Sequence, residues 1–184
     1  MKRLFAAIKI HPSATFIKVL NEISTSLRHE RIKWVEPENM HLTLKFFGET
    51  DEVQIPDICR ALHTAVEQSK PFELKIANTG IFGSRYDPKV IWFGVDKNPE
   101  LDILAKNIFA ELQKCGWTPD RQNFVPHLTI GRIKGIKDKP LFQKIINNFN
   151  TLQIQEENIT EIILYESILQ HEGPIYIKLF SAML

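Results

Sequence analysis

Two short segments of this sequence place a threonine two residues after a histidine. His41 and Thr43 lie in HLTLKF, and His127 and Thr129 lie in HLTIGR. Because strand side chains alternate between faces, each imidazole shares a face with its hydroxyl while the aliphatic neighbours point the other way. Histidine titrates near neutral pH, so one imidazole can accept a proton while the other donates one, and each transfer contributes about 10²–10⁴-fold in rate. Hydroxyl groups hydrogen-bond to phosphate oxygens. Two such strands facing one cleft predict acid–base displacement at phosphorus.

Structural and metal-binding roles are the alternatives for these histidines. A lone histidine on a strand is usually a hydrogen-bonded structural residue, but the recurrence of the same four-residue pattern favours a paired site. Neither motif is accompanied by His-x-His, His-x₃-His or Cys-x-x-Cys spacing, and the chain has no G-x-S-x-G nucleophile motif. We therefore expect no metal and no other cofactor.

The pattern of apolar residues predicts which strands and helices carry the motifs. Strands joined by short links pair in antiparallel fashion, so the expected class is α+β. No Pro/Gly/Ser-rich linker divides residues 1–184, which predicts a single domain, and the presence of one motif in each half predicts that this domain is bilobal. We expect two mainly antiparallel sheets with outer helices around a central cleft, which carries one motif from each lobe. The expected helices are at about 12–28, 55–69, 99–115 and 139–149, and the strands at about 3–10, 41–48, 72–82, 89–95 and 127–133, followed by three C-terminal strands.

Composition limits the remaining function classes. The chain has 184 residues, 43% hydrophobic and 24% charged, with a net charge of +1. This balance is typical of a globular protein without a general attraction for nucleic acid, so local groups must hold any anionic ligand. No apolar run is long enough to span a membrane. Cys59 and Cys115 lack metal-ligand spacing and suit a reducing compartment. We expect a cytoplasmic monomer without membrane association.

The motifs and their flanks resemble a known family. VEPENMHLTLKFFGE and FVPHLTIGRIK are similar to the two signatures of the two-histidine phosphoesterase superfamily, and most closely to the RNA 2′,3′-cyclic phosphodiesterases, historically called 2′-5′ RNA ligases. RLFAAIKI and KVIWFGV resemble that family too, so the similarity covers most of the chain. The resemblance implies a bilobal fold and metal-independent hydrolysis of RNA or nucleoside 2′,3′-cyclic phosphates to 2′-phosphomonoesters.

Functional roles follow from the resemblance by motif position. It implies that His41 is the general acid and His127 the general base, and that Thr43 and Thr129 bind phosphate. The substrates would be RNA ends or small cyclic nucleotides. Two alternatives stay open. One is ligation of 2′,3′-cyclic phosphate and 5′-hydroxyl ends in the same site, and the other is a module that binds nucleotides or RNA without turnover. Binding alone would not need both imidazoles, which argues against the module.

Arg132 is a further candidate for the phosphate site. A guanidinium suits phosphate, but strict alternation puts Arg132 on the Leu128 face, away from the cleft. It reaches the cleft only if the strand ends or bulges at Gly131, and the family pattern favours that role. Gly131 itself stands where the family often has alanine, which predicts a slightly less well packed strand.

Three other residues have both a binding and a structural interpretation. Lys45 shares the His41 face under strict alternation and could bind phosphate or flanking RNA, although a solvated lysine is equally consistent with the pattern. Phe5 could stack on a base or belong to the core. Trp92 is expected in the core.

Overall fold

The computed structural model describes residues 1–118, 124–171 and 173–184. Its strands are β1 (Lys2–Lys9), β2 (Arg31–Trp34), β3 (His41–Thr50), β4 (Phe72–Gly83), β5 (Pro88–Val95), β6 (His127–Gly135), β7 (Gln153–Ile159), β8 (Glu161–Leu169) and β9 (Pro174–Met183). Its helices are α1 (Ala14–Ser26), η1 (Pro37–Asn39), η2 (Glu52–Gln54), α2 (Ile55–Val66), α3 (Pro99–Lys114) and α4 (Lys139–Asn148). The α+β class expected from the sequence is confirmed.

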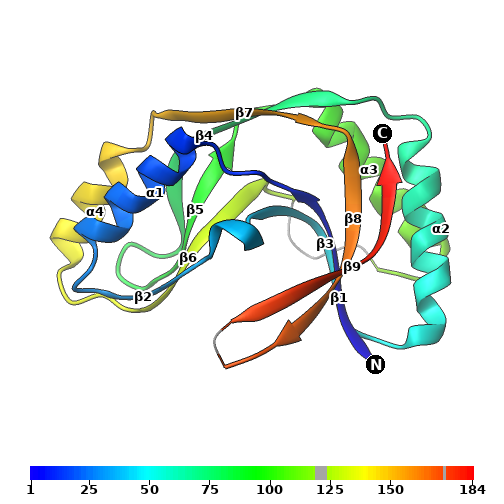
Figure 1. Cartoon of the computed structure of the whole chain (residues 1–184), viewed down its shortest axis with the longest axis horizontal. Helices are drawn as coiled ribbons and strands as arrows, with labels where there is room; N and C mark the ends of the chain where they lie inside the picture. The colour runs from blue at the N-terminus through cyan, green and yellow to red at the C-terminus, as the bar shows by residue number, and fades with distance from the viewer. Residues whose placement is uncertain (119–123, 172) are drawn as a thin grey trace.

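The strands of the described residues form one curved, nine-stranded sheet instead of the two expected sheets. Its order is β7-β4-β5-β6-β3-β1-β8-β9, all neighbours are antiparallel, and β2 pairs separately with β6. The register between β3 and β6 consists of one residue pair, Leu42 with Leu128. Further along β6 its partner is β2, from Gly131 opposite Trp34 to Gly135 opposite Arg31. Because β3 leaves β6 after one pair, the sheet divides into two lobes that stay joined at its centre (Figure 1).

Each lobe is covered by two helices on its outer side (Figure 1). Helices α1 and α4 contact each other and lie against β7 and β4, whereas α2 packs on α3 and β9. Polar N-caps fix where the helices begin, because Ser13, Asn98 and Asp138 accept hydrogen bonds from backbone N–H groups of the first turns of α1, α3 and α4. Of the helices in the described ranges, none is both long and apolar enough to cross a membrane.

Alternation along the two central strands positions the motifs. Leu42, Leu44, Leu128 and Ile130 are buried in the core, with exposed fractions of 0–3%. Burying a leucine or isoleucine side chain stabilises a fold by about 1.5–3 kcal/mol. That burial fixes which face of each strand points inward, so the histidines and threonines face the space between the lobes.

Candidate active site

The two motifs meet at a cleft of about 390 Å³ where the lobes join. His41, Thr43, His127 and Thr129 all line it. The antiparallel register of the central Leu–Leu pair places His41 beside Thr129 and Thr43 beside His127. Within the described residues, no group of three or more His, Cys, Asp or Glu side chains is arranged to hold a metal ion.

Both imidazoles are oriented by the same backbone contact. Nδ1 of His41 lies 2.6 Å from the carbonyl oxygen of Asn39, and Nδ1 of His127 lies 2.8 Å from that of Val125. A carbonyl oxygen only accepts hydrogen bonds, so each Nδ1 carries a proton and donates it. In the neutral rings, Nε2 is then the free acceptor. Each Nε2 is left to exchange a proton with a molecule in the cleft.

Aromatic rings fix the planes of both imidazoles. The His41 ring contacts Phe5 and Tyr176, with centroid distances of 5.0 and 5.2 Å, and these two rings also contact each other at 4.9 Å. His127 meets the ring of Phe82 edge-on at 4.6 Å. Phe5 is only 3% exposed, yet it lines the cleft. Phe5 is therefore a core residue that contacts His41 and lines the cleft, and its stacking on a base stays a prediction.

The electrostatic surroundings lower the pKa of both histidines. Burial is the largest cause for His41, and the positive charges of Lys9, Arg132 and His127 act in the same direction, while the hydrogen bond to Asn39 opposes them. Burial also lowers the pKa of His127, again with a contribution from Arg132 and against its backbone hydrogen bond. Both imidazoles are therefore mainly neutral at pH 7 in the free protein. A bound phosphate anion would favour their protonated forms.

A β-bulge follows the threonine in each motif. On β1, Ala6 and Ala7 pair with Lys45 and Thr43, so Leu44 is the extra residue of β3. On β5, neighbouring residues pair with Gly131 and Thr129, which makes Ile130 the extra residue of β6. An extra residue reverses the alternation beyond it. The bulge puts Arg132 on the face of His127, and Arg132 lines the cleft as the family pattern implied.

The same shift makes the expectation for Lys45 wrong. Lys45 is 5% exposed, does not line the cleft, and its Nζ donates a hydrogen bond to the carbonyl oxygen of Thr118 at 3.3 Å. The bulge at Leu44 turns Lys45 away from the His41 face. Phe46 takes the position facing the cleft instead.

Two glycines make room for tryptophan rings. A Cβ at Gly131 would lie 3.0 Å from Ile32 and 3.1 Å from the Trp34 ring, so the expectation of looser packing at Gly131 is wrong: the tryptophan fills the space. A Cβ at Gly80 would lie 2.2 Å from the ring of Trp92. Trp92 thus packs across β4, outside the cleft lining, whereas Trp34 forms part of the cleft wall.

Several residues that line the cleft were not among the candidates identified from the sequence. They are Arg3, Lys33, Trp34, Phe46, Asn39 and Tyr176. Phe46 was detectable in principle, because it follows His41 by five residues as Arg132 follows His127. The others lie on β1, β2, η1 and β9, and only the tertiary structure brings them to the motifs.

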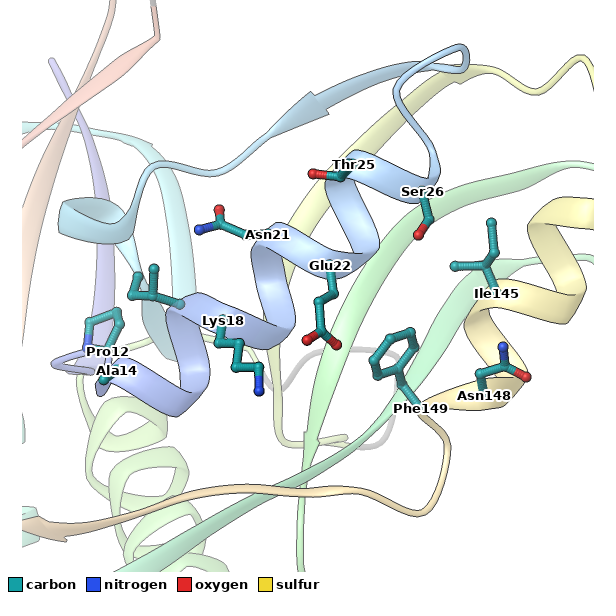
Figure 2. Close-up of a pocket in the computed structure, with 11 residues that line it drawn as sticks. Pro12, Ala14, Lys18, Asn21, Glu22, Thr25, Ser26, Ile145, Asn148 and Phe149 are labelled. Atoms are coloured by element: carbon teal, nitrogen blue, oxygen red, sulfur yellow. The ribbon is translucent and has the colours of Figure 1, made fainter.

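A wider hollow of about 1050 Å³ lies on the outer side of one lobe, between α1 and α4. Figure 2 shows its lining, with Glu22 on α1 and Phe149 at the end of α4 on either side. Lys18 and Glu22 supply its charges, and its described lining contains no histidine. Both histidine motifs line the smaller cleft instead.

Comparisons with known proteins agree with this geometry. The model of the family described as LigT like Phosphoesterase matches residues 10–92 and 94–176, one segment in each half. Proteins named RNA 2′,3′-cyclic phosphodiesterase from Thermotoga maritima and Methanothermobacter thermautotrophicus are 35% and 34% identical to this chain. The first alignment covers 97% of this chain and 94% of the relative, and the second covers 79% of each.

Among solved structures, the fold resembles the crystal structure of TT0787 from Thermus thermophilus. The TM-score is 0.80 at 25% identity, and the superposition covers 99% of this chain and 97% of that one. The family match spans both halves of the chain and both histidine motifs. The chain therefore belongs to the LigT-like phosphoesterase family.

Proposed function

We propose that this chain hydrolyses RNA or nucleoside 2′,3′-cyclic phosphates to 2′-phosphomonoesters, with residues 1–184 acting as one two-lobed unit. The observation that carries the proposal is the pair of imidazoles whose Nδ1 atoms are both bound to backbone carbonyls, which leaves both Nε2 atoms to the cleft. The names of the curated relatives support this substrate class.

The reaction needs two proton transfers at one phosphorus. The hydroxyls of Thr43 and Thr129 would donate to the non-bridging oxygens, and the Arg132 guanidinium would offset their negative charge. Nε2 of His127 takes a proton from water as the water oxygen attacks phosphorus. The bond from phosphorus to the ribose 3′-oxygen breaks, and Nε2–H of His41 protonates the leaving oxygen. The phosphate stays on the 2′-oxygen, and the elements of one water molecule are divided between the new phosphate and the 3′-hydroxyl.

A single assay tests the reaction and its products. Purified protein incubated with a nucleoside 2′,3′-cyclic phosphate in excess EDTA should form the 2′-phosphomonoester, because the proposed groups use no metal. Phosphorus NMR identifies the product. Formation of the 3′-phosphate would reverse the proposed substrate orientation. Activity that disappears with EDTA and returns only with added divalent ion would contradict hydrolysis by the two histidines alone.

The pH dependence should show that both pKa values are lowered. The acid must be protonated and the base neutral, so a plot of kcat/KM against pH should be bell-shaped. Its two limbs report the apparent pKa values of the coupled pair of histidines in the free protein. Because burial lowers both pKa values below the ordinary 6.5, the maximum should lie below pH 6.5. Activity falls above it as the acid loses its proton. Initial rates between about pH 4.5 and 9 measure this, and a maximum above about pH 7 would contradict the assignment.

A further inference from the structure

The hairpin of β8 and β9 contributes residues to the cleft lining and projects beyond the body of the sheet (Figure 1). The register between β1 and β8 ends at Leu4 opposite Glu166. Tyr176 of β9 pairs with Ser167, one residue past that end. Among the described strands, β9 is also the last in the sheet order. Pairing with β1 therefore does not fix the part of the hairpin that carries Tyr176.

The Tyr176 ring completes a triangle of aromatic contacts around the first motif. Its centroid lies 4.9 Å from that of Phe5 and 5.2 Å from that of His41, and it meets the imidazole edge-on at 87°. Phe5 and His41 lie on β1 and β3, which pair along the whole length of β1. The position of Tyr176 depends instead on the hairpin. A group that holds the hairpin beside the motif would therefore preserve this support for the imidazole.

The Asn39 side chain connects η1 to the hairpin. Its Nδ2 donates a hydrogen bond to the carbonyl oxygen of Pro174 at 3.3 Å, two residues before Tyr176. Because a carbonyl oxygen only accepts, the amide nitrogen of Asn39 must face β9. The carbonyl oxygen of Asn39 accepts the hydrogen bond from Nδ1 of His41. One residue therefore contacts both the imidazole and the strand that carries its aromatic neighbour.

The turn that carries Asn39 is fixed to β1 by other groups. Nζ of Lys9 donates a hydrogen bond to the carbonyl oxygen of Glu38, and the N–H of Ile10 donates one to the carbonyl oxygen of Met40 at 3.1 Å. The Met40 side chain is fully buried. The amide of Asn39 is therefore not needed to hold the turn, and the part of the molecule that it can position is the hairpin.

The second motif has a different support for its imidazole. Val125 offers His127 the same backbone carbonyl, but its side chain has no hydrogen-bonding group. The aromatic neighbour of His127 is Phe82, which pairs with Val90 of β5, and Val90 pairs with Arg132 of β6. Paired strands therefore connect this neighbour to the strand of the histidine. The amide occurs in the motif whose aromatic neighbour lies on the projecting hairpin.

We propose that Asn39 is a positioning residue for His41. Its amide holds the start of β9 so that Tyr176 packs against the imidazole, which keeps Nε2 directed at the reacting phosphate. The inference rests on the proposed function, in which His41 protonates the leaving oxygen. Without the amide, the start of β9 can move away from the motif, and the imidazole loses a contact while its backbone hydrogen bond remains. Proton transfer should then suffer more than substrate binding.

Two substitutions remove the donor and leave the backbone carbonyl of residue 39 in place. With a nucleoside 2′,3′-cyclic phosphate, Asn39→Ala should lower kcat by about 5- to 100-fold while KM changes little. The lower value corresponds to one neutral hydrogen bond, and the upper value to a misplacement of about 1 Å. Asn39→Asp should lower kcat at least as far, because an ionised carboxylate only accepts hydrogen bonds and would face the Pro174 carbonyl oxygen.

A double variant tests whether Asn39 acts through Tyr176. Tyr176→Leu should lower kcat by itself, and the addition of Asn39→Ala should then cause little further loss, because both changes remove the same support. If the two losses multiply in full, Asn39 and Tyr176 act independently and the proposal is wrong.

Proton NMR of the histidine rings gives a readout that does not require turnover. The ring current of Tyr176 displaces the His41 ring-proton signals, which are assigned by their absence in His41→Ala. In Asn39→Ala these signals should move towards their positions in Tyr176→Leu, and the signals of His127 should stay in place. The matched control is Asn21→Ala, an exposed asparagine on α1 outside the cleft lining. It should keep the wild-type kcat and the signals of both histidines.

The outcomes separate this inference from the proposed function. A folded Asn39→Ala or Asn39→Asp variant with the wild-type kcat would overturn the role of Asn39, as would unchanged His41 signals in Asn39→Ala. Equal displacement of the His41 and His127 signals would show a general structural effect and would also overturn it. Failure of the wild-type protein to hydrolyse the substrate would overturn the proposed function itself, whereas the NMR comparison would still test whether Asn39 holds Tyr176 against His41.

Discussion

Replacing His127 with alanine should lower kcat for a nucleoside 2′,3′-cyclic phosphate by about 10²–10⁴-fold, and replacing His41 should have an effect of similar size. Each imidazole moves one proton in the same displacement, and Nδ1 of each is already engaged by a backbone carbonyl. No neighbouring group among the described residues can take over the role of the missing Nε2 without a change in that geometry. The double variant should lose little more than the worse single variant, because residues acting as a unit are not additive.

Circular dichroism and urea unfolding should show that these variants remain folded. The matched control is His63→Ala, since His63 is an exposed histidine on α2 whose partner is Glu67 at 3.9 Å. It should retain the full wild-type rate. A folded His41 or His127 variant that turned over substrate at the wild-type rate would remove that histidine from the mechanism.

Leu42→Ala should lower the free energy of unfolding by about 2–5 kcal/mol, the usual cost of a leucine-to-alanine change in a core. Leu42 and its partner Leu128 are both 0% exposed, and they form the residue pair that links β3 to β6. The substitution would leave a cavity where the two lobes join. The sheet holds the neighbouring strands on both sides, so the surroundings would collapse into this cavity only in part. Urea denaturation measures the change as a lower midpoint at an unchanged m-value.

Leu141→Ala is the matched control, because Leu141 lies on α4 and is 46% exposed. Its effect should stay within about 0.5 kcal/mol, as for most surface substitutions. If Leu42→Ala cost no more than Leu141→Ala, the central Leu–Leu contact would not contribute to joining the lobes. Two separate unfolding transitions in the wild-type protein would show that the lobes unfold independently.

Local periodicity was sufficient to predict most of the fold and the centre of the site. The alternation around His41 and His127 predicted two strands with their polar faces in a cleft, and the structure brings those faces together. The residues buried on the opposite faces, Leu42 and Leu128, are the aliphatic ones that the pattern indicated. The start of α1 differs slightly from the expected one because the Ser13 side chain caps the helix there.

The outer part of the site depended on a feature that periodicity does not encode. Nothing in the residue types of Leu44 or Ile130 marks them as bulges, since a bulge is fixed by the registers of the neighbouring strands. One extra residue exchanges the faces beyond it, which brought Arg132 into the cleft and removed Lys45 from it. Two lobes were expected, but the single sheet that they share was equally hidden, because it depends on β2 taking the place of β3 along β6.

The pairing of Leu42 with Leu128 generates a local two-fold axis, because each is the second residue of its motif and the strands are antiparallel. The axis exchanges the two imidazoles and the two hydroxyls, so the centre offers the same groups to a cyclic phosphate in either of two opposed orientations. It does not exchange the walls, where Phe46 occupies on one strand the position that Arg132 occupies on the other. In the proposed reaction, the choice between the 2′ and the 3′ bond would therefore depend on the residues that flank the motifs, Phe46 and Arg132 among them. A descendant of this chain could reverse its product by altering them while keeping both histidines.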